Sequence, residues 1–184
     1  MLQIYVPERE YYDSKTNKFF TVKGKTLQLE HSLVSMSKWE AKWKKYYLTN
    51  KAGMSGEEFL DYIRCMTLTQ NVDPMVYRNL TKENITAILD YIKDPMTATT
   101  FSEEKNKPRN NKNISTEEIY YWMIALNIPM ECQKWHFNRL YTLIKICSIR
   151  NSTAKKKTKS ERINSLKSRA ELNAQRRKML NSSG

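Results

Sequence analysis

Glycine and proline are scarce in this sequence, and their scarcity limits the folds that it can adopt. The 184 residues include four glycines and five prolines, so the chain can form few of the tight turns that a many-stranded sheet needs. Apolar residues make up 40% of the chain, which is enough to build a hydrophobic core. We therefore expect long helices rather than a β-sandwich.

Strands are expected only near the N-terminus, where apolar and polar residues alternate. This alternation predicts strands at about residues 2–6, 18–23 and 26–30. Gly24 lies between the second and third of these strands, where it can supply the positive φ that a tight hairpin turn needs. The sequence thus predicts an antiparallel ribbon of two or three strands.

Helical periodicity replaces the alternation from about residue 32. Side-chain caps predict helix starts at Ser37, Ser55, Thr81 and Ser115, and prolines predict two more at Pro74 and Pro129. The helix after Pro129 is expected to reach about Ile149, and the polar residues 102–114 are expected to form a surface loop. The predicted fold class is mainly α with a short N-terminal β-ribbon (α+β), and a helical globular domain with an N-terminal β-hairpin is expected over residues 1–150.

The composition changes sharply after Asn151. Residues 151–184 contain ten Lys and Arg and two acidic residues, and so carry +8 of the net charge of +13. Residues 159–180 contain no Gly or Pro, but their apolar strip is thin and is formed chiefly by Ile163, Leu166 and Ala170. We expect a basic C-terminal arm over residues 151–184 that becomes helical on a partner, although a solvated tail that only aids solubility is the simpler alternative.

The motifs of the common enzyme classes are missing, so a non-enzymatic protein without a cofactor is expected. The sequence has no glycine-rich phosphate loop and no G-x-S-x-G nucleophile motif. Cys132 and His136 are spaced i, i+4, but a structural zinc site usually needs four ligands, so no metal site is predicted. Three scattered cysteines indicate a reducing compartment, and no secretory signal or membrane-spanning segment is visible.

Aromatic and basic residues are the remaining candidates for a binding surface. Trp135 lies near Arg139, a combination that can stack the bases of single-stranded nucleic acid or contact another protein, although core packing is the commoner role of such a tryptophan. The basic residues of the arm can neutralise phosphates or bind an acidic protein surface. The candidate partner-binding residues are Trp135, Arg139, Arg162, Lys167, Arg169, Arg176, Arg177 and Lys178.

Four segments resemble a family of small proteins from the tail-gene region of tailed bacteriophages. The segments are HSLVSMSKWEAKWKK from residue 31, DYIRCMTL from residue 61, DPMTATTF from residue 94 and YYWMIALNIPMECQKWHFNRLYTLIKIC from residue 120. The resemblance covers about residues 1–180 and includes the basic tail.

The family resemblance implies a role in phage assembly. It implies a tail assembly chaperone that binds the tape-measure protein, or another tail protein, and keeps it soluble in the host cytoplasm before the tail tube assembles. Association with the virion is also compatible with such a role. The alternative is a phage structural or packaging protein that binds nucleic acid or an acidic partner through the arm. No membrane partner is expected, and the oligomeric state stays open.

Overall fold

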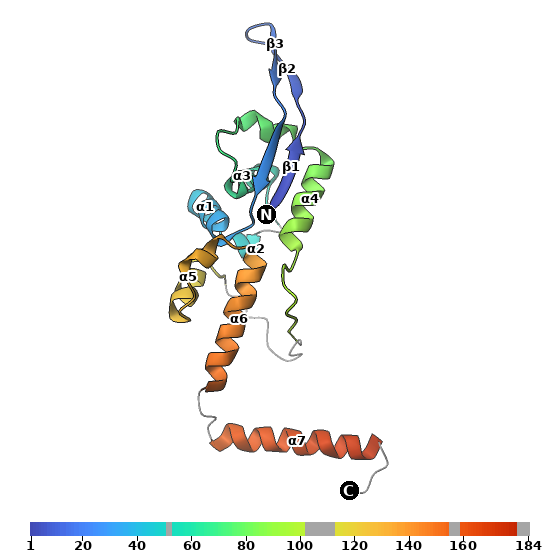
Figure 1. Ribbon diagram of the computed structural model, residues 1–184, viewed down its shortest axis with the longest axis vertical. Helices are drawn as coiled ribbons and strands as arrows, with labels where there is room; N and C mark the ends of the chain where they lie inside the picture. The colour runs from blue at the N-terminus through green and yellow to red at the C-terminus, as the bar shows by residue number, and fades with distance from the viewer. Residues whose placement is uncertain (51–52, 102–112, 155–158, 180–184) are drawn as a thin grey trace. The chain divides into compact units, whose positions relative to one another are not determined.

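The computed structural model describes residues 1–50, 53–101, 113–154 and 159–179. Most of the predicted loop at 102–114 therefore lies outside the described residues. Contacts divide the chain into two compact units, Met1–Lys145 and Ile146–Gly184, which are described separately. The structure is mostly helical, and its named strands lie within the first 30 residues, which confirms the predicted α+β class (Figure 1).

Helices and strands follow one another in a simple order along the chain. They are β1 (Leu2–Val6), β2 (Arg9–Asp13), β3 (Lys18–Val22), β4 (Lys25–Leu29), α1 (Leu33–Trp43), α2 (Tyr47–Asn50), α3 (Gly56–Met66), η1 (Pro74–Asn79), α4 (Lys82–Lys93), α5 (Thr116–Ala125), η2 (Met130–Lys134), α6 (Phe137–Ala154) and α7 (Lys159–Met179). The elements η1 and η2 are 3-10 helices.

The four strands form two antiparallel ribbons rather than one sheet. β1 pairs with β4, and β2 pairs with β3, so the chain runs out along β1 and β2 and returns along β3 and β4. The turn lies at residues 14–17, where the Asp13 carboxylate accepts hydrogen bonds from Lys15 N and Thr16 Oγ1 and Asn17 has a φ of 52°. The predicted hairpin turn at Gly24 is wrong, because Gly24 joins strands of different ribbons and does not have a positive φ.

The β1–β4 ribbon forms one wall of the core of the first unit. Its inward side chains are buried, and so are the facing side chains of α1 and α3; the buried set includes Val6, Leu27, Leu29, Leu33, Met36, Trp39, Tyr62 and Ile63. The indole N–H of Trp39 donates to the carbonyl of Glu58 at 2.9 Å, which satisfies the polar atom of a fully buried ring.

Most helix starts agree with the sequence. Ser55 and Glu58 form the predicted capping box of α3, and Thr81 caps α4 together with Asn84. The side chain of Ser115 accepts a hydrogen bond from Glu118 N at the start of α5. Asp73 caps the short helix η1, whose first residue is proline, as expected.

Two predicted helix starts are wrong. Ser37 lies inside α1, whose cap is five residues earlier because Ser32 and Ser35 form the capping box. Pro129 opens only the short 3-10 helix η2, and the longer helix α6 begins at Phe137. The separation arises because residues 32 and 136 form an isolated antiparallel bridge, in which Phe137 N donates to the carbonyl of His31.

Helix α6 belongs to both compact units. Phe137, Leu140 and Ile144 on its first half are buried in the first unit. Contacts divide the chain between Lys145 and Ile146, within this helix, whereas the sequence places the boundary after residue 150. Among the described helices, none combines the length and apolar character that a bilayer span requires.

Candidate binding surfaces

An apolar groove lies where α3 and α4 approach each other, and we call it the α3–α4 groove. Its volume is about 480 Å³, and it is lined by Tyr47, Met54, Phe59, Leu89, Ile92, Lys93 and Asn138. Leu89 is 38% exposed, although it belongs to the apolar stripe of α4. The groove thus presents aliphatic and aromatic side chains, with one lysine at its rim.

The groove exists because the apolar stripe of α4 is wider than the core can cover. Ile88 and Tyr91 face inward and are buried, while their neighbours Leu89 and Ile92 line the groove. Hydrogen bonds fix the end of α4: Asn138 Nδ2 donates to the carbonyl oxygens of Ile92 at 3.1 Å and Asp94 at 2.6 Å. The C-terminal end of α4, which lines the groove, is therefore held in place by a residue of α6.

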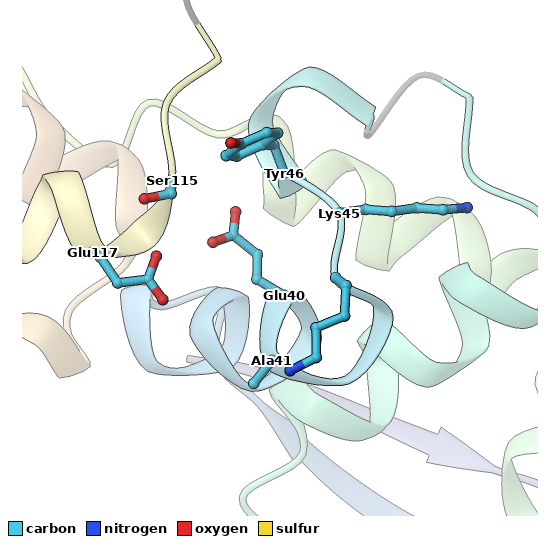
Figure 2. Close-up of a pocket in the computed structure, with 7 residues that line it drawn as sticks. Glu40, Ala41, Lys45, Tyr46, Ser115 and Glu117 are labelled. Carbon is cyan, nitrogen blue, oxygen red and sulfur yellow. The ribbon is translucent and has the colours of Figure 1, made fainter.

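A second hollow, of about 320 Å³, lies between the end of α1 and the start of α5 (Figure 2). Glu40 projects from α1 into this region and is buried. Its carboxylate accepts hydrogen bonds from Tyr47 N at 2.8 Å, Thr116 N at 2.9 Å and Thr116 Oγ1 at 2.7 Å. Because its three donors come from α2 and α5, Glu40 holds these two helices in position against α1.

Helix α5 is apolar around most of its circumference, and only part of it is covered. Ile119 and Met123 are fully buried, whereas Tyr121 is 67% exposed and Ile124 is 65% exposed. A hydrogen bond from Tyr120 OH to Gln133 Oε1 joins α5 to η2. The side chains of Tyr121 and Ile124, which we call the α5 face, form a second apolar surface that contacts solvent.

Two of the candidate partner-binding residues, Trp135 and Arg139, are in contact in the structure. The guanidinium carbon of Arg139 lies 4.5 Å from the centroid of the Trp135 ring, which is a cation–π contact. Trp135 is 37% exposed, so it lies at the surface and is not part of the buried core. The contact orients the indole next to the start of α6.

The other selected residues lie on α7 in the second unit. The side chains of Lys167, Arg169 and Arg176 are exposed, as are those of Ile163 and Leu166. Arg162, Arg177 and Lys178 belong to the backbone of the same helix, and their side chains lie outside the described residues. Positions 162, 169 and 176 are seven residues apart, so they follow one line along the helix.

Two buried histidines form a cluster that sequence reasoning missed. The rings of His31 and His136 lie with centroids 5.1 Å apart, although 105 positions separate them in the sequence. His31 Nδ1 is hydrogen-bonded to Tyr62 OH, and His136 Nε2 lies 3.0 Å from the carbonyl oxygen of Tyr91. The only sequence signal was that His31 follows the last predicted strand, and this does not reveal its neighbour.

The electrostatics of this cluster favour neutral His136. Because a carbonyl oxygen only accepts, Nε2 must carry the proton, and the buried Nδ1 has no hydrogen-bond partner. Burial lowers the pKa of His136. Cys132 lies in η2 and His136 lies in the bridge before α6, so the two residues do not share a helix. In the part of the chain that the structure describes, no three His, Cys, Asp or Glu side chains gather as metal ligands would.

Comparison with known proteins adds no relative. No protein-family model matches the chain, and no curated protein or solved structure with significant similarity to it is found. The α3–α4 groove, the α5 face and the basic residues of α7 are therefore the observations from which a function can be inferred.

Proposed function

We propose that this protein is a tail assembly chaperone of a tailed phage, which binds the tape-measure protein and keeps it soluble until the tail tube forms. The α3–α4 groove carries this proposal. A tape-measure protein is a long helical chain, and its apolar faces stay uncovered until the tube surrounds it. An amphipathic helix can place its apolar side chains in a groove of this kind, and covering those side chains would prevent aggregation.

The size of the groove limits the strength of the contact. Burying one large apolar side chain contributes about 1.5–3 kcal/mol, and association costs at least about 4 kcal/mol in lost freedom of motion. Two or three anchors in about 480 Å³ therefore give weak binding by themselves. The exposed Tyr121 and Ile124 of the α5 face, and Trp135, offer further contacts for a long partner. Weak binding at several places also allows release when the tube assembles.

The test is co-expression of the chain with the tape-measure protein of the same genome, followed by pull-down at moderate salt. Leu89→Glu places a charge in the groove, and Lys93 four residues later supports the new glutamate on the helix. Thr86→Glu adds the same charge at an exposed position of α4 and is the matched control.

We expect the unchanged chain to increase the soluble yield of the tape-measure protein. Leu89→Glu should reduce the captured amount at least about tenfold, which corresponds to the loss of about 1.4 kcal/mol, whereas Thr86→Glu should leave capture unchanged. The proposal fails if the unchanged chain forms no complex, or if both variants behave alike.

A second candidate function is a structural or packaging role in which the arm binds nucleic acid or an acidic partner. The exposed side chains of Lys167, Arg169 and Arg176 on α7 favour it, because basic side chains on a helix can neutralise phosphates. Deletion of residues 151–184 tests this role and leaves the α3–α4 groove in place.

A further inference from the structure

The two β-ribbons differ in how their edges are covered. The outer edge of β4 is paired, because Leu68 N donates to the carbonyl of Gln28 and Gln28 N donates to Thr69 Oγ1. On the side of β1, Asn84 Nδ2 of α4 donates to the carbonyl of Tyr5 at 3.2 Å. In the part of the chain that the structure describes, β2 and β3 pair only with each other, so one edge of each strand stays open.

The β2–β3 ribbon also carries exposed aromatic side chains. Tyr12 and Phe19 form a cross-strand pair with ring centroids 5.0 Å apart, and they are 53% and 68% exposed. Tyr11 and Phe20 stack on the other face, where Tyr11 OH donates to Asn79 and anchors the base of the ribbon. Figure 1 shows this ribbon extending beyond the helices of the first unit. A two-stranded ribbon is marginally stable alone, and open edges with aromatic side chains favour pairing with another strand.

The charges at the two ends of β2 are opposite, so a second copy of β2 is a complementary antiparallel partner for it. The strand reads Arg-Glu-Tyr-Tyr-Asp from Arg9 to Asp13. If two copies of β2 pair antiparallel about a twofold axis at Tyr11, Arg9 of each copy lies opposite Asp13 of the other. The nearest alternative registers differ by two residues, because a shift by one would turn the side chains to the other face. One of them places Glu10 of both copies opposite each other, and the other removes the Arg9–Asp13 pairs. Opposite charges directly across an antiparallel pair are stabilising, and like charges are destabilising.

We propose that two copies of this chain associate through the open edges of β2, and so form a four-stranded sheet in which the two β2 strands are central. The same edge is used by both copies, so the contact closes as a dimer and does not extend into a fibre. The two β3 strands become the outer strands, and each β2 gains a second row of backbone hydrogen bonds. Neither copy uses its α3–α4 groove for this contact.

The first experiment measures the mass of the full chain in solution at tens of micromolar, for the unchanged protein and for Arg9→Asp. We expect a dimer that dissociates on dilution. Arg9→Asp places two aspartates opposite each other at both ends of the contact, so its dissociation constant should rise at least about tenfold. The melting temperature of a dilute sample should be the same for both proteins, which shows that the variant folds.

The second experiment tests the register by cross-linking. Glu10 lies opposite Tyr12 of the second copy, at a spacing that suits a disulfide. A mixture of Glu10→Cys and Tyr12→Cys chains should therefore form a mixed disulfide dimer under mild oxidation. A mixture of Glu10→Cys and Thr21→Cys, with the second cysteine on β3, should not. A monomeric unchanged protein, a dimer that Arg9→Asp leaves intact, or equal cross-linking in both mixtures overturns the proposal.

Discussion

At the residue scale, two buried polar side chains show how distant segments are held together. Glu40 receives three hydrogen bonds from α2 and α5, and His136 packs its ring against His31. A buried polar group is costly unless it is paired. Glu40 is paired throughout, whereas Nδ1 of His136 is not. The histidine is therefore one residue at which a change of pH acts on this fold.

The folded protein should lose stability when the pH falls below 6.5, the ordinary pKa of histidine. Burial lowers the pKa of His136 in the folded state, so the unfolded chain binds the proton more readily. Stability is fully present above pH 6.5 and decreases as the pH falls towards the lowered value. One such group contributes a slope of up to about 1.4 kcal/mol per pH unit.

Urea unfolding between about pH 5 and 7 measures this slope. In His136→Gln the side-chain amide can still donate to the carbonyl of Tyr91 but cannot titrate, so the free energy of unfolding should depend less on pH. If the variant keeps the full slope of the unchanged protein, His136 is not its source.

At the element scale, local signals predict where helices start when the capping residues lie within one turn. Ser55, Thr81 and Ser115 were assigned correctly for this reason. Ser37 and Glu40 have the same spacing, but Glu40 bonds to residues 47 and 116, which the local pattern cannot show. The start of α1 is therefore set by Ser32.

Alanine substitutions test this revised start of α1. Ser32→Ala should lower the free energy of unfolding by about 1 kcal/mol, because the first turn loses its side-chain acceptor. Ser37→Ala, within the helix, should change it by less than about 0.5 kcal/mol. Chemical denaturation of both variants gives the comparison. A larger loss for Ser37→Ala would restore the original assignment.

Strand alternation revealed three of the four strands. It missed β2, because Arg9 to Asp13 contains two adjacent tyrosines and no apolar–polar alternation. The pairing partners were also assigned wrongly, since register depends on which faces are buried and the sequence does not display this directly. The sequence predicted the helix α4, but it did not show that part of its apolar stripe stays exposed. The lining of the groove was not predictable, because it combines residues from Tyr47 to Asn138.

At the scale of the whole molecule, the basic arm can be tested separately from the first unit. If the arm binds nucleic acid, affinity should fall steeply with salt, because bound counterions are released from the phosphates. A chain that ends at residue 150 should not bind. Fluorescence anisotropy with labelled DNA measures both effects.

Two double substitutions then test whether binding depends on the arginines of α7 or only on the total positive charge of the protein. In the variant with Arg169→Gln and Arg176→Gln, the slope of log affinity against log salt concentration should decrease by the amount expected for about two phosphate contacts. Lys38→Gln with Lys82→Gln removes the same charge from exposed positions of the first unit and should have little effect. Binding that survives deletion of the arm, or is indifferent to salt, excludes this role.

The bridge between residues 32 and 136 also has a consequence for the timing of folding during synthesis. The strands that precede α1 are synthesised early, whereas Phe137, the backbone partner of His31, is synthesised much later. Ribosomes add about 5–20 residues per second, so the N-terminal segment waits several seconds or longer for this partner to emerge. During that interval the nascent chain lacks the buried residues Phe137, Leu140 and Ile144, so its core is incomplete. A protein proposed to protect another chain from aggregation thus passes through a vulnerable state itself.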